Sequence, residues 1–115
     1  MKEFIKVMKA LSDPNRVKIV KMLQRRSLCV CELRAILGVA QPTVSKHLRT
    51  LEEAGLVRYS KDGLWVNYSL VVPNGDNSYS ASLLRQMREW LEDDPDIRRL
   101  DNILPGIDRE TVAKR

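Results

Sequence analysis

The sequence predicts a mainly α-helical domain with one β-hairpin, and three features support this prediction. Apolar residues recur at helical spacing through the first 54 residues, two short strand-like runs follow with Asp62-Gly63 between them, and helical spacing returns after residue 80. At 115 residues and 43% hydrophobic composition, the chain suits one compact domain with one main core. We expect that domain to cover residues 1–104, with a C-terminal tail at residues 105–115.

Two helices are predicted at the N-terminus. Residues 3–11 place apolar side chains at helical spacing, at Phe4, Val7, Met8 and Leu11. A second helix follows and runs to about Gln24, because Asp13 can cap its first turn and Pro14 suits its first position.

A helix-turn-helix pattern comes next. A short helix is expected over about residues 31–37, and Gly38 stands where a left-handed C-terminal residue is favoured. Only two residues then separate it from a helix over residues 42–54, which Pro42 begins. Two short helices joined by a tight turn with glycine at its start form a helix-turn-helix.

The pattern then changes from helical to strand-like. Residues 56–60 and 64–70 are rich in β-branched and aromatic residues, and the Asp-Gly pair between them is a strong hairpin signal. A hairpin directly after the second helix of the pattern is a wing, so the predicted class is a winged helix-turn-helix. The C-terminal part is predicted as a loop and two helices, at residues 73–77, 80–91 and 96–104.

Charge is distributed unevenly along the chain. Residues 1–70 hold thirteen Lys and Arg against six Asp and Glu, a net charge of +7, whereas residues 71–115 carry −2. The basic part suits a polyanion such as DNA, and equally an ordinary, mildly basic domain. No apolar run reaches the roughly 18–20 residues of a membrane span, and the first residues lack the apolar stretch of a signal peptide. We therefore expect a cytoplasmic protein with no membrane partner.

The second helix of the helix-turn-helix carries side chains expected to contact double-stranded DNA, because in this pattern it enters the major groove. Gln can pair with adenine, a Thr methyl can contact thymine, and Ser, Lys and Arg can bind phosphates. Lys61, with Arg58 near it, is placed on the wing to reach the DNA backbone. The predicted contacts are Gln41, Thr43, Ser45, Lys46, His47, Arg49 and Lys61. A solvated amphipathic helix and a polar hairpin tip are the plainer alternatives.

Four segments in the same order resemble the ArsR/SmtB family of metal-responsive winged helix-turn-helix repressors. They are residues 10–16 (ALSDPNR), 28–33 (LCVCEL), 41–48 (QPTVSKHL) and 51–57 (LEEAGLV). The resemblance implies a repressor released from its operator by an inducer, and a homodimer formed through the first and last long helices. Some apolar residues exceed what one small core needs, although they could also pack within one protomer: Phe4, Met8, Leu84, Met87 and Trp90.

Cys29 and Cys31 stand one residue apart, a spacing that strains a disulfide and is more typical of metal or redox chemistry. The resemblance implies that they are thiolates of an inducer site for As(III) or Sb(III), or for cadmium or lead. Arsenic-binding relatives often have a third cysteine where this chain has Arg34, and the cadmium and lead type uses cysteines near the N-terminus, which this chain lacks. We therefore expect As(III) or Sb(III), with a third ligand from solution. Residues 80–104 contain no His, so a zinc site of the family's C-terminal type is not expected.

The position of the two cysteines at a helix start suggests a release mechanism. Residues i and i+2 of an α-helix point about 200° apart, so two thiolates there could not both bind one atom. We expect inducer binding to distort the helix start and thereby misalign the DNA-reading helix. We also expect the helix N-terminus and the positive charges of Arg25, Arg26 and Arg34 to lower the pKa of the thiols. The negative charge of Glu32 opposes this effect.

Three other functions can be compared with this prediction. The same fold could sense thiol oxidation or lack a metal response, although oxidation-sensing relatives usually place their cysteines on different helices. An enzyme is not expected, because one His and no Gly-rich phosphate loop leave little catalytic material, and His47 should not meet Cys29 or Cys31 in one cleft. A winged helix that binds only proteins would be expected to lose the basic and amide side chains that this one keeps.

Overall fold

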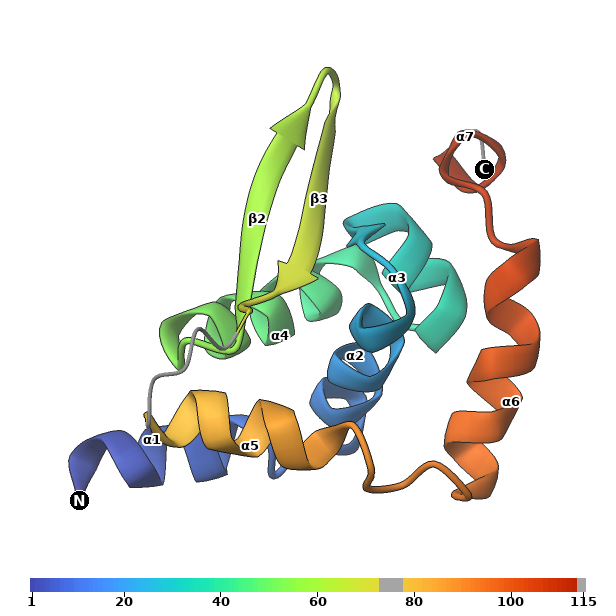
Figure 1. The fold of residues 1–115 in the computed structure, drawn as a ribbon. Helices are drawn as coiled ribbons and strands as arrows, with labels where there is room; N and C mark the ends of the chain where they lie inside the picture. The colour runs from blue at the N-terminus through green and yellow to red at the C-terminus, as the bar shows by residue number, and fades with distance from the viewer. Residues whose placement is uncertain (73–77, 114–115) are drawn as a thin grey trace.

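The computed structural model describes residues 1–72 and 78–113 and confirms the winged helix-turn-helix fold. Helices α1 (Lys2–Ala10) and α2 (Pro14–Arg25) lead into strand β1 (Leu28–Cys29) and the pair α3 (Val30–Leu37) and α4 (Gln41–Glu53). The wing follows as β2 (Val57–Asp62) and β3 (Trp65–Leu70), then α5 (Tyr79–Met87), α6 (Pro95–Ile103), the 3-10 turn η1 (Leu104–Gly106) and α7 (Arg109–Ala113). The wing stands away from the helices, and α5 lies along α1 (Figure 1). The loop predicted at residues 73–77 lies outside the described residues.

The predicted junction between the first two helices is confirmed. The Asp13 Oδ1 atom accepts hydrogen bonds from the backbone N–H groups of Asn15 at 2.8 Å and Arg16 at 3.2 Å, and Pro14 begins α2. These bonds satisfy amides that a helix start leaves without partners. The Arg16 side chain donates to the carbonyl oxygen of Ala10 at 2.7 Å, which fixes α1 against α2.

The predicted tight turn between α3 and α4 is also confirmed. Gly38 has a φ of 69°, a left-handed conformation that glycine adopts without the steric cost of a Cβ atom. One face of α4 is fully buried, through Val44, Leu48 and Leu51, and packs against α2 and α3. The other face of α4 is thereby left toward solvent.

The sheet has three strands rather than the two predicted. Its order is β1-β3-β2, and β1 pairs with β3 through Leu28 opposite Tyr68 and Cys29 opposite Asn67. Strand β2 extends two residues beyond its predicted end and β3 begins one residue later than predicted, with a two-residue turn that begins at Gly63 (φ 62°). Cys29 therefore belongs to the same sheet as the wing.

The helix predicted over residues 80–91 is too long by about one turn. The side chain of Lys21 is fully buried, and its Nζ atom donates to the carbonyl oxygens of Met87 at 2.7 Å and Trp90 at 2.8 Å. These bonds satisfy carbonyl groups at a helix end, and Leu91 then turns the chain with a φ of 64°. A lysine 66 residues away, which local periodicity cannot reveal, thus marks the end of α5.

Residues 105–113, expected as a tail, form η1 and α7, and α7 packs against α3. Arg26 donates to the carbonyl oxygen of Ile107 at 2.9 Å, and Arg34 donates to that of Val112 at 3.4 Å. Helices α6 and α7 lie on the side of the molecule opposite the N-terminus (Figure 1).

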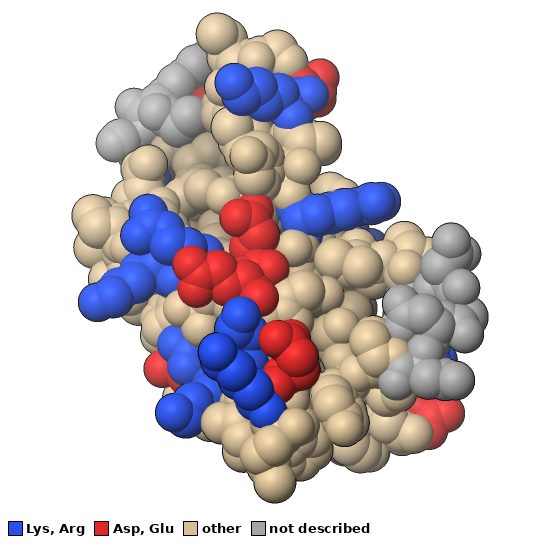
Figure 2. All heavy atoms as spheres, turned by 90° about the vertical axis from the view of Figure 1, so that its left-hand side faces the viewer, with Lys and Arg blue, Asp and Glu red and all other residues tan. Residues whose placement is uncertain are grey.

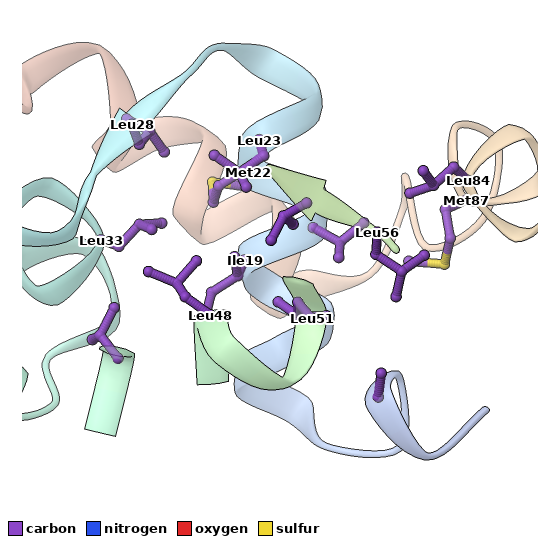
Figure 3. Packing of buried hydrophobic residues seen from close by; sticks show 14 of the residues in the cluster. Ile19, Met22, Leu23, Leu28, Leu33, Leu48, Leu51, Leu56, Leu84 and Met87 are labelled. Atoms are coloured by element: carbon purple, nitrogen blue, oxygen red, sulfur yellow. The ribbon is translucent and has the colours of Figure 1, made fainter. Parts of the chain in front are cut away.

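One core joins the helices and the base of the wing. Leu33 of α3, Leu48 of α4 and Ile19 of α2 lie together at its centre (Figure 3). Leu84 and Met87 of α5 belong to the same core, so two of the five side chains proposed for the dimer contact serve the packing of the protomer itself. None of the helices in residues 1–72 and 78–113 is long and apolar enough to cross a membrane.

Candidate DNA-binding surface and thiol site

The outer face of α4 carries most of the predicted DNA contacts. Gln41, Thr43, Lys46 and Arg49 are exposed, and Ser45 is half-buried. Because the opposite face of α4 is buried in the core, these polar side chains lie on the solvent side of the helix. A recognition helix needs this arrangement to enter the major groove.

His47, also predicted as a DNA contact, faces the body of the domain. Its side chain is 13% exposed, with Nδ1 3.2 Å from the Arg16 Nη1 atom and Nε2 3.9 Å from the Asp13 Oδ1 atom. The imidazole thus links α4 to the junction of α1 and α2. Arg16 is 31 residues distant in the chain, so the sequence pattern gave no sign of this contact.

The wing presents Lys61 and Arg58 as exposed basic side chains on β2. The carboxylate of Asp62, next to Lys61, is paired with Arg109 at 3.3 Å, so its charge is compensated within the chain. On the side where α1 begins, by contrast, Lys and Arg side chains lie interspersed with Asp and Glu side chains (Figure 2). That side lacks the single sign of charge that favours a polyanion.

The two thiols lie side by side. Cys29 precedes α3 with an extended backbone (φ −87°, ψ 168°), Cys31 is in the first turn of α3, and their Sγ atoms are 2.8 Å apart. The expectation that these side chains point about 200° apart is wrong, because it requires both residues to be helical. Both sulfurs therefore face one position without any distortion of α3.

The prediction of activated thiolates is wrong for Cys29. Burial raises the pKa of Cys29 to about 12, and the neighbouring Cys31 thiol and Glu32 carboxylate contribute in the same direction. Two of the arginines expected to lower this pKa are instead paired with carboxylates. Arg25 pairs with Glu92 and Asp101, and Arg26 pairs with Glu32. Cys29 is therefore a neutral thiol at pH 7.

Glu32 has a structural role at this site that the sequence analysis missed. It is buried, its Oε1 atom accepts the backbone N–H of Cys29 at 2.9 Å, and its Oε2 atom accepts from Arg26 Nη1 at 3.0 Å. A glutamate three residues after the residue that precedes a helix is typical of a capping box, which was the available signal. This bond holds the backbone of Cys29 in place beside Cys31.

A cavity of about 240 Å³ opens beside the two thiols. Its wall includes Gln41, the first residue of α4, and Leu64 and Trp65 of the wing. The guanidinium of Arg109 lies over the Trp65 ring, 5.0 Å from its centroid. A group bound to the thiols would therefore adjoin both elements expected to contact DNA.

The thiol pair offers two protein ligands. Both cysteines are free, and within residues 1–72 and 78–113 no group of three or more Cys, His, Asp and Glu side chains could hold a metal ion. Arsenic in its trivalent state is thiophilic, and two adjacent sulfurs fit it as a donor set. Arg34, at the position of a third cysteine, instead bonds to α7.

A helix-turn-helix with an exposed polar second helix and an adjoining wing defines a winged-helix DNA-binding protein. The chain belongs to the ArsR family of bacterial regulatory proteins, which matches residues 13–59. It is 37% identical over 97 residues to the arsenic resistance transcriptional regulator ArsR1 of Pseudomonas putida, covering 82% of this chain and 74% of that protein.

Some other similar proteins are not named for arsenic resistance. The chain is 47% identical over 66 residues to the cadmium resistance regulatory protein CadC homolog of Staphylococcus aureus, covering 56% of this chain and 54% of that protein. Among solved structures, the transcriptional repressor BigR of Xylella fastidiosa superposes with a TM-score of 0.65 at 26% identity, covering 81% of this chain and 88% of that one.

Proposed function

We propose that this protein represses transcription by binding operator DNA as a homodimer, and that As(III) or Sb(III) bound to Cys29 and Cys31 releases it. The observation that carries the proposal is the 2.8 Å separation of the two Sγ atoms beside a cavity walled by α4 and the wing. The arsenic resistance regulator of Pseudomonas putida, similar over most of the chain, supports the choice of inducer.

The proposed DNA contacts divide into two kinds. Gln41 and Thr43, exposed at the N-terminal end of α4, are placed to read base edges, and Ser45, Lys46 and Arg49 to bind phosphates. Lys61 would contact the DNA backbone from the wing. We assign His47 to fixing α4 on α2, because its imidazole bonds to Arg16 rather than facing solvent.

The proposed dimer contact lies on α1 and at the end of α5. Ile5 and Met8 of α1 and Met1, directly before it, are 40%, 39% and 92% exposed, and Trp90 is 49% exposed. An exposed apolar group of this kind on a small domain is typical of a protein contact surface. The substitution Ile5→Glu should therefore shift the protein toward monomer in sedimentation velocity.

Proton balance distinguishes arsenous acid from a divalent metal at this site. As(OH)₃ reacts with two thiols to form two As–S bonds and break two As–O bonds, and the thiol protons leave with the hydroxyl groups as water. Arsenic stays trivalent, and no proton is released. Cadmium must instead displace the thiol protons, so its binding depends on pH in a way that the binding of arsenous acid does not.

Two contacts would couple the thiol pair to DNA binding. Cys29 pairs with Asn67 on β3, and α3 packs against α4, so a shift of Cys29 is felt by both the wing and the recognition helix. The bound arsenic would also adjoin Gln41 in the cavity wall. The inducer releases DNA if it binds better to a geometry that the DNA-bound form does not adopt.

The experiment measures the anisotropy of a fluorescent operator fragment, taken upstream of the gene, during titration with sodium arsenite. Cys29→Ser and Cys31→Ser test the ligands, and Ser27→Ala is the matched control because it leaves both thiols in place. We expect arsenite to release the wild type and the control but neither cysteine variant. The arsenite midpoint should change little between pH 6.5 and pH 8, whereas a cadmium midpoint should fall as protons are displaced more easily.

Tight operator binding that arsenite leaves unchanged would refute the inducer assignment while preserving the DNA role. Thiol oxidation is the second candidate, since two Sγ atoms 2.8 Å apart could also form a disulfide. Mass spectrometry after oxidant would then show the loss of about two hydrogens.

A further inference from the structure

We propose that the thiol cavity takes trivalent arsenicals that carry one organic substituent, with Cys29 and Cys31 as the arsenic ligands and the apolar wall around the substituent. This inference rests on the proposed function, because it specifies the ligand class of the same thiol pair. Two independent features carry it: the number of thiols and the chemistry of the cavity wall.

The number of thiols matches a monosubstituted arsenical. Such a compound, R–As(OH)₂, has two hydroxyl groups that thiols can replace. Cys29 and Cys31 would form two As–S bonds, two As–O bonds would break, and two water molecules would leave with the thiol protons. The As–R bond is untouched, and arsenic stays trivalent. Inorganic arsenous acid would keep one hydroxyl group on arsenic, because the described residues offer no third protein ligand to replace it.

The cavity wall suits an apolar third group on arsenic. Its lining includes Val30, Leu64, Trp65 and Val66, with Gln41 as the one polar side chain besides the thiols. A hydroxyl group moved from water into such surroundings loses hydrogen bonds, whereas an apolar substituent gains from burial. A volume of about 240 Å³ is below the roughly 300–1,000 Å³ of pockets for drug-sized ligands, so a methyl or phenyl group is the appropriate size.

Trp65, on the aromatic side of the wall, is held in place before any ligand binds, whereas Leu64 is 99% exposed. Arg109 of α7 lies over the Trp65 ring and pairs with Asp62, which stands opposite Trp65 in the wing. These contacts fix the aromatic side of the cavity. A preformed site loses less conformational entropy on binding than one that must be ordered.

The expected preference can be stated as a ratio. A buried methyl-sized group favours binding about fourfold, and a phenyl ring, even partly buried, about tenfold or more. Because organic substituents also alter intrinsic arsenic–thiol affinity, the ratio for the protein is divided by the same ratio for dithiothreitol. We expect the corrected preference for phenylarsine oxide over arsenite to exceed tenfold.

The experiment titrates the full chain with phenylarsine oxide and with sodium arsenite and measures binding by isothermal titration calorimetry. Val66→Thr adds a hydroxyl group to the cavity wall with little change in shape, and should lower the corrected preference several-fold. Val72→Thr is the matched control, because Val72 is 62% exposed and does not line this cavity. Cys29→Ser and Cys31→Ser should each abolish tight binding of both compounds.

The outcomes separate this inference from the proposed function. A corrected ratio near one that Val66→Thr leaves unchanged, with both compounds still requiring Cys29 and Cys31, would overturn the inference and leave inorganic induction standing. Binding of neither compound, or binding that survives Cys29→Ser, would overturn both. A corrected preference above tenfold that falls in Val66→Thr and persists in Val72→Thr would support the organic ligand class.

Discussion

The buried carboxylate of Glu32 should determine how well the first turn of α3 holds Cys29. Replacement by Ala removes the acceptor for the Cys29 N–H group at 2.9 Å and the partner of Arg26 at 3.0 Å. An unpaired buried N–H costs about 1–3 kcal/mol, whereas Arg26 is 40% exposed and can regain water. We therefore expect Glu32→Ala to lower the free energy of unfolding by about 2–3 kcal/mol.

The substitution Glu32→Gln isolates the hydrogen bond from the charge. The amide oxygen can still accept the Cys29 N–H bond, so the expected loss is only about 1 kcal/mol. Urea unfolding followed by circular dichroism measures both variants. Glu53→Ala, at the exposed C-terminal end of α4, is the control and should change stability by less than about 0.5 kcal/mol.

The same pair of variants tests the thiol site. Glu32→Ala should weaken arsenite binding, because the backbone that places Cys29 beside Cys31 is released, and Glu32→Gln should retain it. Equal and small stability losses in both variants, with unchanged arsenite binding, would refute the capping argument.

The raised pKa of Cys29 predicts a loss of stability at alkaline pH. Its contribution is full below the ordinary thiol pKa of 9.0 and is lost as the pH rises toward about 12, by up to ~1.4 kcal/mol per pH unit. Urea unfolding should show the advantage of wild type over Cys29→Ala shrinking between pH 8 and pH 10; a constant gap would contradict this. Arg109→Ala should lower stability by less than about 1 kcal/mol, because its contacts are partly exposed, yet shift Trp65 emission to the red as the ring gains water. Unchanged emission would show that α7 does not hold Trp65. Lys46→Ala should weaken operator binding similarly across sequences and reduce the salt slope of log affinity by about one, whereas Gln41→Ala should relax preference at one base pair, at a cost of about 1–3 kcal/mol. Anisotropy at several salt concentrations with single-base operator variants separates the two, and identical behaviour would contradict the assigned roles.

The local signals in the sequence were sufficient for the helix-turn-helix and the wing. Asp13 and Pro14 mark a helix start through bonds within three residues, and the turn at Gly38 depends on one backbone angle that glycine favours. Asp62 and Gly63 likewise mark the hairpin over a few residues. Each of these features is decided by neighbours in the chain, so pattern and propensity find it.

Features decided by distant partners were not predictable in this way. Strand β1 has two residues, too few to show an alternating pattern, and it exists because β3 offers partners to Leu28 and Cys29. The end of α5 depends on Lys21, and the order of α7 depends on its packing against α3. For the cysteines, the geometric argument treated both residues as helical, whereas Cys29 precedes α3 and its extended backbone places its thiol beside that of Cys31.

This placement of Cys29 explains how a small ligand could control a much larger interface. Coupling between two sites typically amounts to about 1–3 kcal/mol, which a few altered contacts can supply. Cys29 occupies the end of a two-residue strand that joins the sheet of the wing and also precedes the helix that packs on α4. A short strand has few backbone hydrogen bonds to break. A ligand that repositions Cys29 therefore needs only a small difference in binding free energy between the repositioned form and the original form. In the proposed function DNA is bound by both the wing and α4, and Cys29 is connected to both.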